Sequence, residues 1–247
     1  MNPGLYIVGT PIGNLGDVTL RSLETLKTAS LIIAEDTRHT RKLLDRHGIH
    51  TPMMSCHKFN EASRTSLVLE RIAGGAAVAL VTDAGMPAVS DPGSRVVAAC
   101  REQGFPITAI PGPSAVTTAV ALSGFSGGGF HFDGFLPHKS GARRRRLQAL
   151  AGEEIPVVLF ESPYRLIKLL GEIEEVLGPR CVFVARELTK QFEECRVGTP
   201  AEIRAAYGNR TVKGELVVII APASDREETE RPGPEVEEGG NDETVSG

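Results

Sequence analysis

The stretch Ala77–Gly93, AVALVTDAGMPAVSDPG, decides the fold class of this 247-residue chain. It begins with a short apolar run and continues into a loop rich in Gly and Pro that carries Asp83 and Asp91. Such an apolar run predicts a strand of a parallel sheet that is buried on both faces. Ligands of these sheets bind beyond the carboxyl ends of the strands, so Asp83 is placed to meet a cationic or hydroxyl group. Ser90 or Asp91 is expected to cap the helix that follows.

The same alternation of apolar runs and helical periodicity extends along most of the chain. It predicts strands at Leu5–Gly9, Leu31–Glu35, Ala77–Thr82, Pro106–Ile110, Phe130–Phe135, Val157–Glu161, Cys181–Arg186 and Leu216–Ala221. It predicts helices at Leu20–Ala29, from about Thr37 to His47, Glu61–Ala73, Ser94–Gln103, Arg143–Ala151 and Leu166–Leu177. The glycine-rich run Ser123–Gly129 reads as a linker. We therefore predict two α/β domains, residues 1–122 and 123–222, followed by a tail, residues 223–247.

Three loops rich in Gly and Pro follow predicted strands of the first domain. Besides the loop after Ala77–Thr82, these are Gly9–Asn14 (GTPIGN) and Pro111–Ala115 (PGPSA). Gly9–Asn14 is not a GxGxxG dinucleotide motif, because Pro11 stands at the position of the second glycine. Glycine allows a ligand to approach the backbone closely. Three such loops in one domain favour a single ligand cleft over three unrelated turns.

The charge of the chain is divided unevenly between its body and its tail. The formal net charge is −4, which at first argues against a nucleic-acid ligand. Residues 223–247 hold nine acidic and two basic residues, so the remaining 25 basic and 22 acidic residues give the body a net charge of +3. The tail has almost no apolar residues and is expected to be disordered.

Composition also limits the location and the chemistry of the protein. The four cysteines, Cys56, Cys100, Cys181 and Cys195, form no CxxC pair, so we expect neither a zinc site nor a disulfide framework. No apolar run reaches the roughly 18 residues that a membrane-spanning helix needs. The amino terminus carries no signal-peptide pattern. These features favour a cytoplasmic protein with no membrane association and no metal.

Six motifs resemble those of a known family when they are taken in chain order. They are TPIGNL, AEDTRHT, TDAGMPAVSDPG, IPGPSA, ESPYR and ARELTK, and the match covers about Leu5 to Ala221. The motifs resemble the tetrapyrrole methylase superfamily and, within it, the RsmI-like 16S rRNA (cytidine 2′-O)-methyltransferases. Longer members of this group have an additional C-terminal domain, whereas this chain has the acidic tail at that position.

The resemblance implies a homodimeric, two-domain α/β enzyme with an interdomain cleft that binds S-adenosylmethionine. It implies methylation of a cytidine ribose in the decoding region of small-subunit rRNA. The residues expected to bind the methyl donor are Pro11, Asp83, Gly85, Val89, Ser114, Ala115, Phe160, Glu161, Gly214 and Glu215.

The acceptor hydroxyl is a poor acid, so a base or a cation near it would assist the transfer. Polar residues at strand ends, among them Glu35 and Glu161, are candidates for this chemistry. Our predicted catalytic residues are Asp36 and Glu187 as proton acceptors, and Arg38 and Lys190 as cations that stabilise the developing charge. Pairs such as Asp36–Arg38 are also commonly plain ion pairs.

Two basic stretches are candidates for RNA binding, because cations that neutralise phosphates release counterions. The predicted RNA-binding residues are Lys139, Arg143, Arg144, Arg145, Arg146, Arg41 and Lys42. Aromatic residues make up 5% of the chain and Trp is absent, so extensive base stacking is not expected. A solvated charged helix face would explain the run Arg143–Arg146 equally well.

Two other functions remain open from the sequence. A C-methyltransferase acting on a tetrapyrrole or corrin precursor would use the same donor loops. A regulatory module that binds nucleotides would also use glycine-rich loops, but the chain has no Walker-type Gly-Lys-Ser/Thr sequence after any predicted strand.

Overall fold

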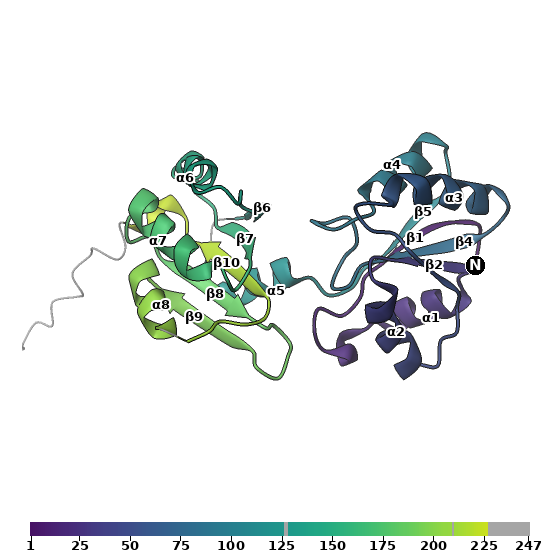
Figure 1. Cartoon of the computed structure of the whole chain (residues 1–247), viewed down its shortest axis with the longest axis horizontal. Coiled ribbons are helices and arrows are strands. Elements are labelled where there is room, and N and C mark those ends of the chain that lie inside the picture. The colour runs from purple at the N-terminus through teal and green to yellow at the C-terminus, as the bar shows by residue number, and fades with distance from the viewer. Residues whose placement is uncertain (126–127, 209, 227–247) are drawn as a thin grey trace, which may run out of the picture.

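The computed structural model describes residues 1–125, 128–208 and 210–226, and it contains two five-stranded sheets (Figure 1). The first sheet has the strand order β3-β2-β4-β1-β5, and all of its pairings are parallel. Its strands are β1 (Gly4–Val8), β2 (Leu31–Ala34), β3 (Met53–Ser55), β4 (Ala77–Val81) and β5 (Ile107–Ile110). The predicted parallel sheet is therefore confirmed.

Helices cover both faces of the first sheet, as its continuously apolar strands require. The helices α1 (Leu20–Thr28) and α2 (Thr37–Arg46) pack on one face, and α3 (Glu61–Ala73) and α4 (Ser94–Glu102) pack on the other (Figure 1). Every residue of the central strand β4 is buried. This burial holds the carboxyl ends of β1, β2 and β4 in fixed positions, from which the loops of the site begin.

The second sheet has the order β6-β7-β10-β8-β9 and is mixed. Only β6 and β7 are parallel, and the other three pairings are antiparallel. Its strands are β6 (His131–Phe135), β7 (Val157–Glu161), β8 (Val182–Arg186), β9 (Glu194–Gly198) and β10 (Leu216–Ile220). The helices α6 (Ser140–Ala149), α7 (Leu166–Leu177) and α8 (Pro200–Tyr207) cover one face.

The other face of the second sheet packs against α5 (Ala115–Ser123) and against residues of the first loop. Val116 and Ala119 of α5 lie in one apolar cluster with Ile12 and with residues of β7, β8 and β10. The predicted division at residue 122 stays a prediction, and α5 packs with the strands that follow it in sequence. Two short 3-10 helices, η1 (Leu15–Asp17) and η2 (Ala223–Arg226), complete the described elements.

Besides the two 3-10 helices, four of the described elements were not predicted: β3, α5, β9 and α8. The apolar residues of α5 are spread around the helix, so it has no helical stripe. The edge strand β9 has five residues, ECRVG, none of which is buried, so it lacks the apolar run by which the other strands were predicted. In contrast, α8 begins with a capping box, in which Thr199 and Glu202 bond reciprocally to backbone N–H groups, so a recognisable signal was present. Of the tail predicted to be disordered, residues 223–226 form η2, contrary to the prediction, and residues 227–247 lie outside the described residues.

Candidate active site

A cavity of about 570 Å³ lies between the two sheets, and both contribute to its walls. Apolar side chains such as Ile12, Met86 and Val217 form part of the lining. Nine of the ten residues predicted to bind the methyl donor also line it: Asp83, Gly85, Val89, Ser114, Ala115, Phe160, Glu161, Gly214 and Glu215. Pro11 is buried and is not among the lining residues. The three loops of the first domain therefore meet at one cavity.

Backbone hydrogen bonds fix the first two loops to each other. The N–H of Thr10 donates to the carbonyl of Gly85 over 2.9 Å, and the N–H of Gly85 donates back over 3.2 Å. The hydroxyl of Thr10, which is buried, also donates to the carbonyl of Thr82. Gly85 has a φ of +84°, a conformation that favours glycine. This pairing sets the shape of the cavity wall beneath Asp83.

Two carboxylates of the cavity are poorly solvated. Burial raises the pKa of Asp83, although the hydrogen bond from the backbone N–H of Asp36 opposes the rise. Burial also raises the pKa of Glu161, whose Oε1 lies 3.1 Å from Nε of Arg165. Within the described residues, Oε2 of Glu161 has no hydrogen-bond partner. Because buried carboxylate oxygens are normally bonded, this oxygen is suited to a ligand group that donates or carries positive charge.

The predicted catalytic residue Asp36 caps helix α2 and pairs with the predicted Arg38. Its carboxylate accepts the backbone N–H of Arg38 and two guanidinium N–H groups over 2.7–3.1 Å. The side-chain hydrogen bond from Arg38 is the main reason that the pKa of Asp36 lies well below its usual range. Neither residue lines the cavity. Asp36 is therefore a weak proton acceptor in this arrangement.

The other two predicted catalytic residues form a network beside the cavity. Nζ of Lys190 lies 2.8 Å from Oε1 of Glu187 and 2.6 Å from Oε2 of Glu215. Burial by itself would raise the pKa of Glu187. The hydrogen bonds that its carboxylate accepts from Lys190 and from the N–H of Glu215 outweigh burial and hold this pKa below its usual value. Glu187 and Lys190 do not line the cavity, whereas Glu215 does.

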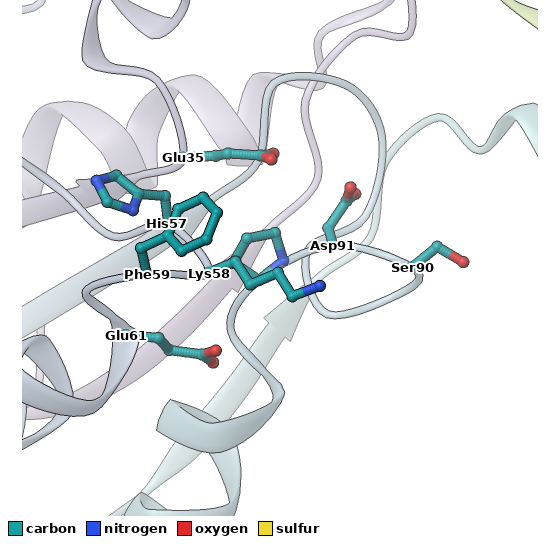
Figure 2. Close-up of a pocket in the computed structure, with 8 residues that line it drawn as sticks. Glu35, His57, Lys58, Phe59, Glu61, Ser90 and Asp91 are labelled. Atoms are coloured by element: carbon teal, nitrogen blue, oxygen red, sulfur yellow. The ribbon is translucent and has the colours of Figure 1, made fainter. Parts of the chain in front are cut away.

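A second cavity of about 570 Å³ adjoins the first, and Glu35, Ser90 and Asp91 line both of them. Figure 2 draws the side chains around this second cavity, including His57 and Phe59 from the segment between β3 and α3. Burial and the neighbouring carboxylates raise the pKa of Asp91 to about 6, against the effect of a hydrogen bond with Thr82. Glu35 was among the strand-end residues predicted as candidates for the acceptor chemistry, whereas no role was predicted for His57 or Phe59.

The predicted capping role of Ser90 or Asp91 is wrong. Helix α4 has Gly93 at its N-cap position, without a side-chain cap. Instead, Oε1 of Glu61, at the start of α3, accepts the N–H groups of Gly93 and Arg95. Glu61 reaches α4 because α3 and α4 lie side by side on one face of the sheet (Figure 1). Asp91 is consequently not used as a cap and lines the two cavities.

Two of the predicted RNA-binding residues are engaged inside the fold. Arg143 is 2% exposed and is paired with Glu172, so it is not available to bind RNA and that prediction is wrong. Arg146 is half-buried and bonds both carboxylate oxygens of Asp133. The other predicted residues are exposed: Lys139, Arg144, Arg145, Arg41 and Lys42.

Within residues 1–125, 128–208 and 210–226, no helix is long and apolar enough to cross a membrane. In the same residues, no group of three or more His, Cys, Asp or Glu side chains is arranged to hold a metal ion.

Solved structures with this fold include a cobalt precorrin-4 methyltransferase and a diphthine synthase. The structure superposes on cobalt precorrin-4 methyltransferase with a TM-score of 0.65 and 19% identity, covering 88% of this chain and 94% of the other. For a diphthine synthase, the TM-score is 0.68 with 15% identity, covering 88% of this chain and 89% of the other. At these identities the likeness establishes the two-sheet fold.

Sequence comparison gives the family. The model of the tetrapyrrole (corrin/porphyrin) methylases matches residues 4–204, and the chain belongs to this family. It is similar to proteins named ribosomal RNA small subunit methyltransferase I. The relative from Thermotoga maritima is 45% identical over 217 residues, which are 88% of this chain and 97% of the relative. The relative from Synechocystis sp. is 46% identical over 221 residues, which are 89% of this chain and 79% of the relative.

Membership in this family makes the chain a methyltransferase whose methyl donor is S-adenosylmethionine. The predicted fold class and the predicted cofactor are thereby confirmed. The roles of individual site residues stay predictions.

Proposed function

We propose that this protein transfers a methyl group from S-adenosylmethionine to the ribose 2′-hydroxyl of a cytidine in the decoding region of small-subunit rRNA. The observation that carries the proposal is the similarity over most of the chain, at 43–46% identity, to proteins named ribosomal RNA small subunit methyltransferase I. Two adjoining cavities support it, because a donor and an acceptor need neighbouring sites for in-line transfer.

The cavity between the sheets is the proposed donor site. When bound there, S-adenosylmethionine supplies a methyl group that passes from its sulfonium sulfur to the acceptor oxygen. The carboxylates of Asp83 and Glu161 suit the positive charges of this donor, and the unbonded Oε2 of Glu161 is an acceptor for one of its polar hydrogens. Apolar side chains such as Ile12 and Phe160 suit its adenine ring.

Asp91 is our proposed acceptor of the hydroxyl proton. It lines both cavities, and a pKa of about 6 keeps it ionised at neutral pH while making it a stronger base than an exposed carboxylate. Asp36 is held by Arg38 with a lowered pKa, so we give Asp36 and Arg38 a positioning role at the start of α2. Glu187 and Lys190 hold Glu215 at the cavity wall.

Exposed cations on two helices form the proposed RNA-binding surface. Arg41 and Lys42 belong to α2, whereas Arg144 and Arg145 belong to α6, which begins just after Lys139. Arg144 pairs with Glu175, but both partners are about half exposed, and such surface pairs contribute little and exchange easily. These residues suit the phosphates of folded RNA, which is recognised largely through its shape and backbone.

A homodimer in the cytoplasm completes the proposal. The edge strand β9 exposes Val197, and an unpaired edge with an apolar side chain is a natural site of association. Sedimentation velocity of the purified protein tests the dimer, for which a single species of one-chain mass would be the contrary result.

The function is tested on rRNA from cells that lack this protein. Ribose methylation is mapped across small-subunit rRNA, and one decoding-region cytidine is expected to lose its methyl group. The purified protein with methyl-labelled donor should restore the label on subunits from these cells. Labelling of a tetrapyrrole precursor in place of the subunits would instead support the C-methyltransferase alternative.

Two variants test the proton acceptor in the same assay. Asp91→Asn is expected to lower kcat about 100-fold or more, in line with the usual contribution of a general base. Asp36→Asn is expected to affect turnover less, provided that both variants remain folded and bind the donor. Full turnover in Asp91→Asn with loss in Asp36→Asn would give the role to Asp36.

A further inference from the structure

Most of the side chains that line the second cavity have no role in the proposed donor site. The second cavity adjoins the donor cavity through Glu35, Ser90 and Asp91. Its other walls come from the segment between β3 and α3, from Glu61 at the start of α3 (Figure 2) and from Pro92. Its volume of about 570 Å³ lies in the range of sites that take a small organic group.

An exposed aromatic ring stands at this cavity. Phe59 is 93% exposed, although it lines the cavity and lies in edge contact with His57, with ring centroids 6.2 Å apart. The turn that carries the two rings is fixed, because Oδ1 of Asn60 accepts the N–H of His57 over 2.8 Å and Nδ2 of Asn60 donates to the carbonyl of Ser55. A fixed turn thus presents a large apolar ring to solvent, as a stacking surface requires.

Two carboxylates of the same cavity offer hydrogen-bond acceptors. Glu35 uses Oε2 to accept the hydroxyl of Thr82 over 2.8 Å, and Glu61 uses Oε1 for the N–H groups that begin α4. In the part of the chain that the structure describes, these bonds occupy one oxygen of each carboxylate. The second oxygen of each remains an acceptor for a ligand that donates hydrogen bonds.

We propose that this cavity binds the base of the acceptor nucleotide and selects one with an exocyclic amino group, as in cytosine. Phe59 stacks on the base, and the carboxylates of Glu35 and Glu61 accept from its amino group. Carboxylates pair with the amino group of cytosine, whereas uracil presents a carbonyl oxygen at that position and would be repelled. The proposal rests on the proposed function, since it assumes that the substrate is RNA.

The placement of the two cavities agrees with this assignment. The base and the 2′-hydroxyl of one nucleotide are joined through a single ribose ring, so their binding sites must share a wall. Glu35, Ser90 and Asp91 form such a wall, and Asp91 is the proposed proton acceptor. A base in the second cavity thus leaves its ribose beside the donor site. Stacking of an unpaired base on an aromatic side chain is a common way for proteins to hold RNA.

Removal of the ring tests the stacking. Phe59→Ala is expected to lower kcat/KM for undermethylated small subunits about tenfold, mainly through KM, because stacking on a side chain contributes roughly that much. Phe59→Tyr should retain most of the activity. The matched control is Phe192→Ala, which removes another exposed phenyl ring that lines neither cavity and should leave kcat/KM unchanged. The affinity for S-adenosylmethionine, measured by calorimetry, should be the same in all four proteins.

Exchange of the target base tests the selection. Subunits reconstituted with uridine at the mapped position should be methylated by the wild-type protein at least about tenfold more slowly than the cytidine form. If Phe59→Ala matched the wild type, or if uridine were methylated equally well, the base site would be overturned while rRNA methylation stood. If the wild-type protein methylated no subunit, the proposed function itself would fail.

Discussion

Gly9 and Gly112 lie in direct backbone contact, which brings the first and third loops of the donor cavity together. A Cβ atom on Gly9 would lie 2.7 Å from Cα of Gly112, and a Cβ atom on Gly112 would lie 2.9 Å from Cα of Gly9. Real Cβ atoms essentially never approach other atoms that closely. A side chain at either position would therefore push apart the two loops that carry Ile12 and Ser114 to the cavity.

We predict that Gly9→Ala destabilises the protein by about 1–3 kcal/mol, the usual cost of forcing extra volume into a packed site. Its affinity for S-adenosylmethionine should fall as well, because Ser114 and Ala115 would move. Gly152→Ala is the control, since no atom lies within 4 Å of a Cβ atom built there. Chemical denaturation and calorimetry measure the two effects, and equal behaviour of the two variants would contradict the prediction.

The substitution Asp83→Asn removes the negative charge of this side chain from the donor cavity and leaves its hydrogen bond in place. Oδ1 of Asp83 accepts the N–H of Asp36 over 3.1 Å, and the amide oxygen of Asp83→Asn can make the same bond. We expect the Kd of S-adenosylmethionine to rise about tenfold, equivalent to ~1.4 kcal/mol. The Kd of S-adenosylhomocysteine, which has a neutral sulfur, should change little. An equal loss for both ligands would show that the carboxylate does not respond to the sulfonium charge.

The run Arg143–Arg146 combines a structural residue with surface residues, and variants separate the two. Arg143→Ala should cost about 3–5 kcal/mol of stability, because it leaves the buried carboxylate of Glu172 without its cation. Arg145→Ala should leave stability nearly unchanged but weaken RNA binding and reduce the salt dependence by about one counterion. Thermal unfolding and filter binding at several salt concentrations measure these outcomes. Normal stability of Arg143→Ala would contradict the assignment.

Asp91 makes the stability of the protein depend on pH. Its pKa is about 6 in the folded chain and lies near 3.8 when exposed, so the folded state binds more protons between these values. The contribution of Asp91 to wild-type stability should therefore fall as the pH rises from about 4 to 7. Asp91→Asn should remove this decline and be more stable than the wild type at pH 7, by on the order of 1–3 kcal/mol. Asp45→Asn, on an exposed part of α2, is the control, and parallel pH curves for all three proteins would contradict the prediction.

Most strands of the first sheet were predictable from sequence because they are short apolar runs, of which β4 is buried throughout, whereas the three-residue edge strand β3 was missed. The run AVALV and its loop predicted β4, and with it the position of Asp83 at the end of a strand. In the second sheet the edge strand β9 is half exposed, and the pairing direction of its neighbours depends on contacts between distant strands. The mixed topology was therefore not predictable from local periodicity.

The loops that line the donor cavity were predicted better than the roles of charged residues. Glycine and proline at strand ends mark loops locally, whereas the environment of a charged residue depends on partners far away in sequence. Arg143 reads as part of a basic run, but Glu172 on α7 buries it. In the same way, Asp91 reads as a helix cap, and Glu61 of α3 takes that role. Both outcomes depend on helix packing, which the sequence did not reveal.

The reciprocal bonds between Thr10 and Gly85 have a consequence for the thermodynamics of ligand binding. These bonds join the two loops through the backbone of the chain itself, so the shape of the cavity wall does not depend on contacts with the methyl donor. Little conformational entropy is then lost on binding, so more of the contact energy remains as affinity.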